Sequence, residues 1–243
     1  MMKTWQERYL DALYNPAHGW VDGTTEFHSI CKSTIPPAAK ILEVGAGPTN
    51  RTSLFLASIG EVHGVDIDPE ALHNEALTAR HVIVDDEYPL PDASFDACVS
   101  NYVAEHVEHP ERHLREICRV LKPGGAYILR TPNAVHYVAL ISKHTPFWFH
   151  RLVANRLRGR GKDQHDPYPT FYAMNTKSGL AALAGGAGLE VEHLRLVEKE
   201  PSYGMSSRAL FIAFAGYERL VNSTEALGFM RSNIFAVLRK PSR

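Results

Sequence analysis

Two glycines follow directly on a short apolar run, in the Glu-Val-Gly-Ala-Gly segment at 43–47. Glycines let the backbone turn sharply there and approach a bound ligand closely. A turn that binds a nicotinamide dinucleotide carries a third glycine three residues further on, where this chain has Asn50. The segment predicts a ligand-binding turn and disfavours the dinucleotide type, with a plain strand-to-helix turn as the alternative.

Acidic side chains end the next two apolar runs. Asp66 ends the first, and Asp85 and Asp86 end the second. A carboxylate at Asp66 can accept hydrogen bonds from ribose hydroxyls, and one at 85 or 86 from an exocyclic amine such as that of adenine. Asp66 could instead cap a helix, although Asp68 before Pro69 is the better N-cap candidate, and the aspartate pair could be a solvated loop. The carboxylates together favour a ligand of the adenosine type.

The elements that must position these residues alternate between strand and helix patterns. Strands are expected at 40–44, 61–66, 82–85, 95–100 and 126–130, with helices through 54–59, from 69, and at 110–121. This alternation predicts βαβ units and a parallel sheet with helices on both faces. The flanking segments add helices at 4–15, 24–33, 136–143, 147–158, 177–187 and 208–227, and strands at 189–197 and 234–238.

The composition limits the class of protein. The chain has 243 residues, 44% hydrophobic and 22% charged, with a formal net charge of −1. These values fit one α/β domain and give no basic excess for a nucleic-acid partner. The three cysteines lie far apart without a CxxC pair, so we expect them to be reduced. The N-terminal segment is too polar for a signal peptide, and no apolar run approaches the ~20 residues that span a bilayer, so a cytoplasmic location is expected.

Four stretches carry a family resemblance: ILEVGAGPTN, VHGVDIDP, YPLPDASFDACVSNYVAEHV and EICRVLKPGGAYILRTPN. In order and spacing they resemble the class I S-adenosylmethionine (SAM)-dependent methyltransferases, over about residues 40–133. The resemblance implies a Rossmann-like α/β fold of seven strands, with the last strand antiparallel and next to the strand at 189–197. A single domain is expected, with an N-terminal helical cap (1–37), a SAM-binding core (38–133), a lid or substrate insertion (134–176) and C-terminal strands and helices (177–243).

The resemblance also implies which residues contact SAM. Some would line the methionine moiety, others the ribose and adenine, and one segment would pass near the sulfonium. Asp85 and Asp86 stay open as alternatives for the adenine amine, because the spacing to the following Tyr-Pro pair is one residue short of the family pattern. The expected cofactor contacts are Glu43, Gly45, Ala46, Gly47, Asp66, Ile67, Asp85, Asp86, Ser100, Asn101 and Tyr102.

Two histidines are candidates for a general base, which methyl transfer needs only if the acceptor keeps its proton. His106 follows the fourth strand and His136 follows the fifth, and both are expected at the carboxyl edge of the sheet. A structural role is the alternative for His106. Some relatives bind a metal through Glu-x-x-Glu-His, but Tyr102 replaces the first glutamate here, so no metal is expected. The substrate lid is expected to use His165, Asp166, Tyr168 and Tyr172.

The acceptor is expected to be a small molecule, methylated at oxygen or nitrogen. A non-catalytic SAM-binding or regulatory module and, less favoured, an NAD-dependent oxidoreductase are the alternatives. No base-flipping motif of the Asn-Pro-Pro-Tyr type is present, so no nucleic-acid partner is expected. A basic run at 151–162 beside aromatic residues at 147–149 could recognise a phosphate or carboxylate or contact an anionic membrane surface, with a solvated helix face as the alternative.

Overall fold

The computed structural model describes residues 4–137, 139, 168–200 and 205–242. The chain forms two compact units. The core unit consists of Phe27–Pro132, Pro169–Arg195 and Asn233–Arg243. The second unit consists of Met1–Glu26, Asn133–Tyr168 and Leu196–Ser232. The helices expected at 136–143 and 147–158 fall largely outside the described residues.

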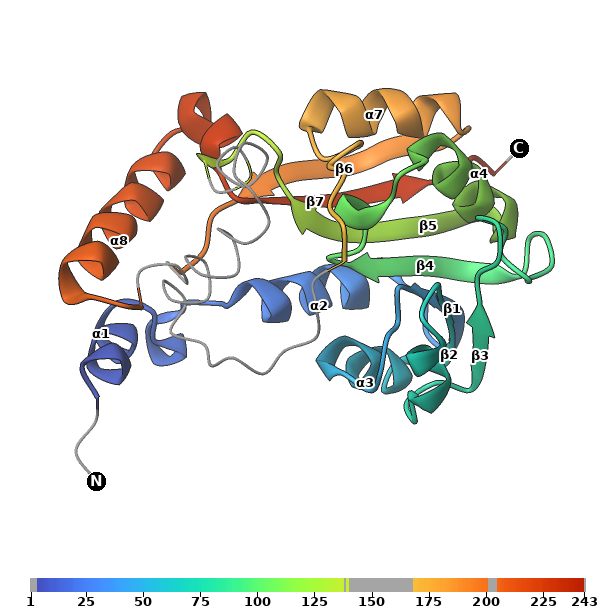
Figure 1. Ribbon diagram of the computed structural model, residues 1–243, viewed down its shortest axis with the longest axis horizontal. Helices are drawn as coiled ribbons and strands as arrows, with labels where there is room; N and C mark the ends of the chain where they lie inside the picture. Colours follow the sequence, from blue (N-terminus) through green and yellow to red (C-terminus); the bar gives the residue numbers. More distant parts are fainter. Residues whose placement is uncertain (1–3, 138, 140–167, 201–204, 243) are drawn as a thin grey trace. The chain divides into compact units, whose positions relative to one another are not determined.

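A seven-stranded sheet in the order β3-β2-β1-β4-β5-β7-β6 forms the centre of the core unit (Figure 1). β1 pairs in parallel with β2 and β4, which continue in parallel to β3 and β5, whereas β7 runs antiparallel to β5. The expected Rossmann-like sheet with an antiparallel last strand is therefore confirmed. The strands are β1 Ala39–Val44, β2 Gly60–Asp66, β3 Ala79–Val82, β4 Phe95–Asn101, β5 Leu121–Pro132, β6 Glu190–Val197 and β7 Asn233–Arg239.

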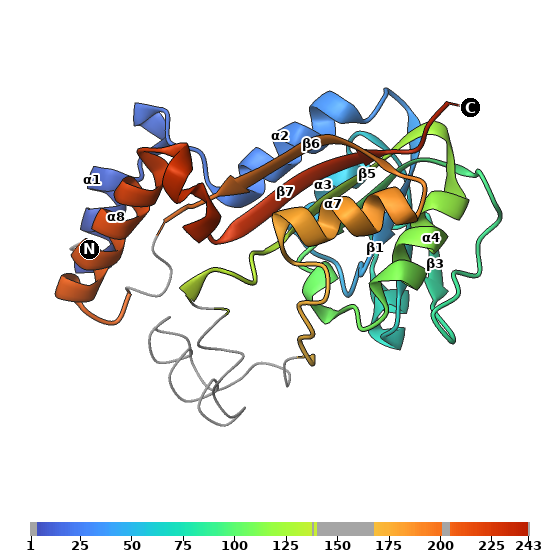
Figure 2. The ribbon, with the colours of Figure 1, turned by 90° about the horizontal axis from the view of Figure 1, so that it is seen from above.

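Helices cover both faces of this sheet, with α2 and α3 on one face and α4 and α7 on the other (Figures 1 and 2). The helix α4 begins with a proline at its first position and buries apolar side chains at 114, 117 and 120, so one stripe faces the sheet. Its last turn is held by Lys240, whose ammonium donates to two carbonyls at its C-terminal end. The bounds are α2 Gly23–Thr34, α3 Arg51–Ala57, α4 Pro110–Val120 and α7 Lys177–Gly186.

Several element boundaries differ from the sequence expectations, and the helix expected at 208–227 ends at Asn222. β3 spans Ala79–Val82 rather than 82–85, because residues 84–87 form a tight turn closed by a Val84–Glu87 bridge. The helix expected from Pro69 is a short 3-10 helix, η2 (Pro69–His73). β5 begins at residue 121 instead of 126, and its pairing with β4 shifts register between Phe95 and Ala97.

The second unit is built around α1 (Trp5–Leu13) and α8 (Arg208–Asn222), which lie side by side (Figure 2). Trp5 and Tyr9 pack edge-on against Phe211 of α8, with ring centroids 6.1 and 5.6 Å away. Such edge-to-face pairs suit the charge distribution of aromatic rings. These aromatic residues are therefore core residues of this unit. Short 3-10 helices complete it, η1 (Pro16–His18) and η5 (Glu225–Met230).

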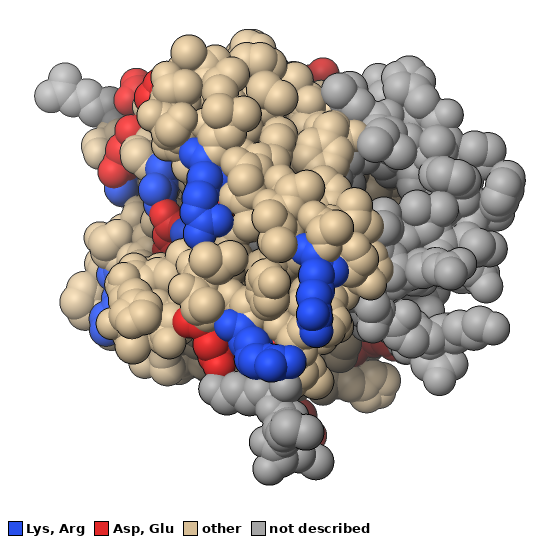
Figure 3. Space-filling view, turned by 90° about the vertical axis from the view of Figure 1, so that its left-hand side faces the viewer, with Lys and Arg blue, Asp and Glu red and all other residues tan. Residues whose placement is uncertain are grey.

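Charge is mixed on the face that carries α1 and α8 (Figure 3). On the part of that face that the structure describes, Lys and Arg lie beside Asp and Glu within a larger uncharged area. A continuous basic surface of the kind that binds nucleic acid is not seen there. Within the described ranges, the helices are all too short or too polar to cross a membrane.

Candidate cofactor site and active site

The glycine turn after β1 admits no side chain at Gly45. Its φ is +68°, and a Cβ there would lie 2.3 Å from Cγ2 of Val103. Gly47 also has a positive φ, of +52°, but a Cβ there would meet no atom of the described residues within 4 Å. Gly45 thus allows close packing of the turn, whereas the space beside Cα of Gly47, where a side chain would stand, is open to a ligand.

Asn50, which stands where a dinucleotide site has its third glycine, has a structural task. Its side-chain oxygen accepts from the amides of Thr52 and Ser53, so Asn50 is the N-cap of α3. Its amide group donates to the carbonyls of Ala46 (2.8 Å) and Pro48 (3.2 Å). One side chain therefore holds both the turn and the start of the helix.

Asp66 reaches from the end of β2 to the glycine turn. Its carboxylate accepts from the amides of Gly47 (2.8 Å) and Asp68 (2.9 Å). The expected N-cap role belongs to Asp68, which accepts from the amide of Glu70 at 2.8 Å. Carboxylate oxygens have further acceptor positions, so Asp66 can still bind hydroxyl groups. Ile67 follows it with 61% of its surface exposed, available to an apolar ligand face.

Glu43, at the end of β1, is a buried carboxyl group with spare hydrogen-bonding capacity. It is 4% exposed, and its Oε2 atom has no hydrogen-bond partner among the described residues. Burial raises the pKa of Glu43 to about 7, a hydrogen bond from Ser53 lowers it, and the charge of Asp66 raises it. A buried acceptor of this kind favours a positively charged or hydrogen-donating ligand group beside it.

Asp85 and Asp86 form the corner of a tight turn after β3. Their φ angles are +53° and +62°, and the amide of Glu87 donates to the carbonyl of Val84 at 3.0 Å. Two left-handed central residues with this bond are typical of a type I′ turn, which aspartate tolerates better than most residues. The carboxylate of Asp86 lies 3.8 Å from Arg112, whereas Asp85 is exposed at the corner.

The end of β4 divides its side chains between the two faces of the sheet. Ser100 is fully buried, and its hydroxyl lies 2.7 Å from that of Tyr127. The amide group of Asn101 donates to the hydroxyl of Thr52 on the α3 side. Tyr102 has a φ of +62° and donates its hydroxyl hydrogen to Asn233 at 2.8 Å. A bulky residue held in the left-handed region is a strained feature of the kind found at functional sites.

The next residues, in the 3-10 helix η3 (Ala104–His106), bring a carboxyl group and an imidazole together. Nε2 of His106 lies 3.9 Å from Oε1 of Glu105. Nδ1 of His106 lies 2.8 Å from the carbonyl oxygen of Pro169, so in the neutral ring Nδ1 carries the hydrogen and Nε2 the lone pair. In this tautomer His106 has a basic Nε2 atom, with a carboxyl oxygen 3.9 Å away.

Glu105 is held by β5 and by the segment that precedes α7. It is 5% exposed and accepts from the hydroxyl of Thr131 at 2.9 Å. That hydroxyl oxygen accepts from the amide of Asn175 at 2.6 Å. The backbone carbonyl of Glu105 accepts from the amides of Phe171 and Tyr172. Burial raises the pKa of Glu105, while its own backbone and the charge of His106 lower it.

The other predicted site residues are divided among the two units and the residues that the structure does not describe. His136 and Tyr168 belong to the second unit. His136 is 5% exposed, with Nε2 3.5 Å from Glu198, and burial lowers its pKa to about 4. Tyr172 is in the core unit, bound to Glu105 as described above, whereas His165 and Asp166 fall outside the described residues.

Sequence reasoning missed several residues at this edge. The sequence patterns single out Glu105 only as part of a metal motif and Thr131 only as part of the last family stretch, and they do not single out Asn175. Thr131 follows the Leu-Lys-Pro-Gly-Gly strand directly, and this position was the one available signal. Within the described residues, no group of three or more His, Cys, Asp and Glu side chains could hold a metal ion.

Comparisons with known proteins agree with this geometry. Residues 42–129 match a family described as a methyltransferase domain. An uncharacterized methyltransferase of Mycobacterium sp. (strain JLS) is 38% identical over 192 residues, covering 76% of this chain and 68% of that protein. The chain belongs to the class I SAM-dependent methyltransferase family. A Mycolicibacterium smegmatis protein named as a probable SAM-dependent methyltransferase is 30% identical over 174 residues, which cover 66% of each protein. The matched region thus spans about two thirds of these relatives' length.

Solved structures place this methyltransferase in the same fold. A SAM-dependent methyltransferase from Methanosarcina mazei superposes with a TM-score of 0.56 at 19% identity, covering 88% of this chain and 98% of that one. The [4+2]-cyclase SpnF superposes with a TM-score of 0.57 at 17% identity, covering 98% and 94%. These identities show the fold alone, and a fold does not fix the reaction.

Family membership makes SAM the cofactor of the methyltransferase, and the residues present fit it. The open space beside Cα of Gly47, the carboxylate of Asp66 and the buried acceptor of Glu43 meet at one edge, between β2 and β4. Ligands of open α/β sheets bind at this carboxyl edge.

Proposed function

We propose that this methyltransferase transfers the methyl group of SAM to oxygen or nitrogen of a small-molecule acceptor. The observation that carries the proposal is the convergence of Gly47, Asp66 and Glu43 at the carboxyl edge of the sheet. In a direct displacement the acceptor lone pair forms the new bond to the methyl carbon while the carbon–sulfur bond breaks, and S-adenosylhomocysteine leaves with the electron pair. Because the donor is already activated, the protein contributes mainly position and exclusion of water.

The cofactor contacts follow from the chemistry of each side chain. Asp66 would accept from the ribose hydroxyls, and Glu43 would face the positive charges of the methionine moiety. Between the two candidates for the adenine amine we propose Asp85, because Asp86 has Arg112 beside it. Gly45 and Ala46 would line the methionine moiety together with Gly47, and Ile67 would pack on the adenine.

After β4, the backbone of Ser100 and the side chains of Asn101 and Tyr102 would contact the cofactor near the sulfonium. The hydroxyl of Ser100 is engaged by Tyr127, which leaves its backbone for the cofactor.

His106 is the proposed general base where the acceptor is a hydroxyl. Its Nε2 lone pair can take the acceptor proton, and the nearby Glu105 carboxyl group would stabilise the imidazolium that forms. His106 is accessible, with 30% of its side chain exposed, whereas burial makes His136 a weaker and less accessible base. We propose Tyr172 as an acceptor contact, because its backbone bonds to Glu105 next to His106.

The proposed acceptor is a small molecule rather than nucleic acid, which agrees with the net charge of −1. The free thiols of Cys31, Cys98 and Cys118 agree with a reducing compartment, and the cytoplasm is the proposed location.

The test is transfer of labelled methyl from SAM to cell extract, separated into small-molecule, lipid-glycan, protein and nucleic-acid pools. Label in the small-molecule pool is expected, and label in another pool instead would overturn the proposed acceptor class. Asp66→Ala should abolish transfer. Asp68→Ala is the matched control, since Asp68 also accepts an amide hydrogen bond in the same loop but has no proposed ribose contact.

Binding measurements separate the remaining alternatives. Calorimetry with SAM and S-adenosylhomocysteine should show binding by the wild type. Binding without transfer to any pool would support a non-catalytic SAM-binding module. Binding of neither ligand would contradict the central proposal, and binding of NAD in their place would favour the oxidoreductase.

A further inference from the structure

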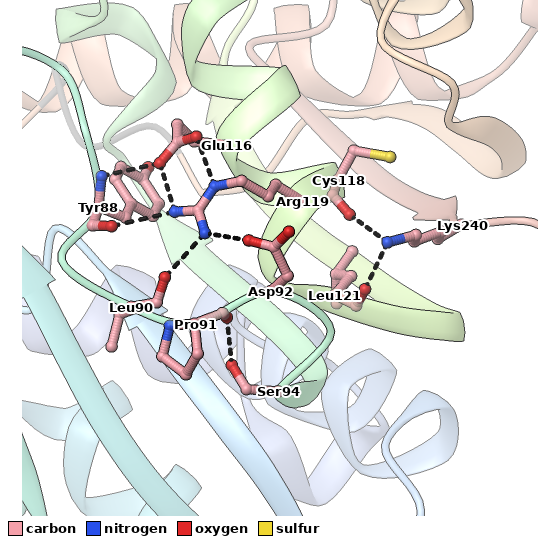
Figure 4. Close-up of polar contacts among 10 residues, drawn as sticks. All are labelled: Tyr88, Leu90, Pro91, Asp92, Ser94, Glu116, Cys118, Arg119, Leu121 and Lys240. Atoms are coloured by element: carbon pink, nitrogen blue, oxygen red, sulfur yellow. Dashed lines mark hydrogen bonds and ion pairs between the residues drawn. The ribbon is translucent and has the colours of Figure 1, made fainter.

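One guanidinium of the core unit joins a carboxylate of its own helix to the loop that follows residue 87. Arg119, near the end of α4, has five N–H donors. Nε and Nη2 donate to both carboxylate oxygens of Glu116, at 2.8 and 2.7 Å (Figure 4). Nη1 donates to the carbonyl of Leu90 at 2.8 Å and to Asp92 at 2.7 Å, and Nη2 also donates to the carbonyl of Tyr88 at 3.0 Å.

The same pair holds Tyr88 from its other side. The Oε2 atom of Glu116 accepts from the amide of Tyr88 at 2.8 Å, so both backbone groups of that residue are bound to α4 (Figure 4). The fork-to-fork geometry of Arg119 with Glu116 makes this a strong, directional contact. These hydrogen bonds therefore fix the backbone of Tyr88 relative to α4.

Tyr88 comes two residues after the strained turn at Asp85 and Asp86. Left-handed backbone is less favourable for aspartate than for glycine, so contacts outside this turn help to hold its conformation. On one side the turn is closed by the bond between Val84 and Glu87. On the other side the chain continues to Tyr88, whose backbone is bound to Glu116 and Arg119.

The side chain of Tyr88 extends the connection toward the other end of the proposed cofactor site. Its hydroxyl lies 3.1 Å from Nδ1 of His113, whose Nε2 lies 3.1 Å from the hydroxyl of Tyr127. That hydroxyl lies 2.7 Å from Ser100 at the end of β4. These side chains are all buried, so the chain of hydrogen bonds is shielded from water.

We propose that Arg119 is a positioning residue for cofactor recognition, which acts through Tyr88 to hold the Asp85–Asp86 turn where Asp85 meets the exocyclic amine of adenine. Arg119 itself touches no cofactor in this proposal. It sets the preference of the site for adenine over a purine that lacks the amine. The inference rests on the proposed binding of SAM and deepens it.

The test compares two ligands by calorimetry: S-adenosylhomocysteine and its 6-deamino analogue, in which hydrogen replaces the exocyclic amine. The wild type should prefer S-adenosylhomocysteine by about tenfold or more, as expected for a hydrogen bond to a charged group. In Arg119→Met this preference should fall to about twofold or less, mainly because S-adenosylhomocysteine binds more weakly. Asp85→Ala should have the same effect, and the double variant should add nothing further.

Lys122→Met is the matched control, because Lys122 makes an ion pair of the same 2.7 Å length with Asp96, at the other end of β4. It should leave the ligand preference unchanged. If Arg119→Met does not fold, Arg119→Lys is measured in its place. Lysine keeps the positive charge but cannot donate two parallel hydrogen bonds to the carboxylate of Glu116.

The outcomes separate this inference from the proposed function. Equal weakening of both ligands in the Arg119 variant, or additive effects of the two substitutions, would show a merely structural role and overturn the inference. A wild type that binds S-adenosylhomocysteine without preferring it would also overturn the inference, while leaving the proposed function standing. A wild type that binds neither ligand would overturn both.

Discussion

The carboxyl group of Glu43 is poised to change its charge near neutral pH. Burial raises its pKa to about 7, so in the free protein it is close to half ionised at pH 7. SAM carries positive charge where Glu43 is proposed to lie, so binding favours the ionised form. SAM affinity should therefore rise by up to about tenfold between pH 6 and pH 8, measured by calorimetry. Glu43→Gln should lose this dependence, and the same slope in that variant would refute the assignment.

Tyr127 is the central link between His113 and Ser100, and its hydroxyl is fully buried. Tyr127→Phe should lower the free energy of unfolding by about 2 kcal/mol, because two buried polar groups lose their partner. Urea unfolding measures the change. Tyr9→Phe is the control, since the ring of Tyr9 packs on Phe211 and no comparable bond is lost. A loss below about 0.5 kcal/mol for Tyr127→Phe would contradict the role of this link.

At the scale of single residues, the sequence could predict the role of a residue where local backbone conformation alone determines that role. The turn at 45–47 and the N-cap Asp68 follow from local rules. The face on which Ser100 lies could not be predicted, because it depends on Tyr127 in the neighbouring strand. The sequence shows Asn50 only as a residue in the place of a third glycine, because its hydrogen bonds to α3 and to the glycine turn depend on the fold.

The start of α3 is the element most closely tied to the proposed cofactor site. Asn50→Ala should lower the free energy of unfolding by about 1 kcal/mol through loss of the N-cap. It should also weaken SAM binding, because Asn50 holds the carbonyl of Ala46 in the glycine turn. Thr176→Ala removes the N-cap of α7 and is the matched control for stability.

The two capping variants should therefore lose similar stability in urea unfolding. Only Asn50→Ala should lose affinity for SAM in calorimetry. Equal affinities in both variants would mean that the turn keeps its shape without Asn50.

At the scale of elements, strand and helix order could be predicted well because both faces of the central strands are buried and apolar. β3 was misplaced because it lies at the edge of the sheet and its sequence, Ala-Arg-His-Val, is only half-buried. The apolar run at 82–84 predicts a strand, but it leads into the turn at 85–86. Edge strands need no continuous apolar run, so their position depends on the neighbouring strand.

At the scale of the whole molecule, burial shifts the pKa values of a histidine and a glutamate in opposite directions in each unit. In the core unit burial lowers the pKa of His113 to about 4 and raises that of Glu43 to about 7. In the second unit burial does the same for His136 and Glu198. Between about pH 4.5 and 6.5, unfolding makes each histidine bind a proton and each glutamate release one. The two effects oppose each other, so these four groups together leave stability nearly independent of pH in that window.

Removing one glutamate should reveal the pH dependence of stability that the opposing histidine contributes. In Glu43→Gln, the unfolded state binds one more proton than the folded state through His113, so the free energy of unfolding should rise with pH relative to wild type by about 1.4 kcal/mol per unit between pH 4.5 and 6.5. Urea unfolding at pH 4.5, 5.5 and 6.5 measures the slope. His113→Asn added to Glu43→Gln should remove the extra slope, although it lowers stability at every pH by breaking the bonds to Tyr88 and Tyr127. An unchanged slope in Glu43→Gln would mean that the carboxyl group of Glu43 is already ionised in the folded protein, and the pH dependence predicted for SAM binding would then be lost with it.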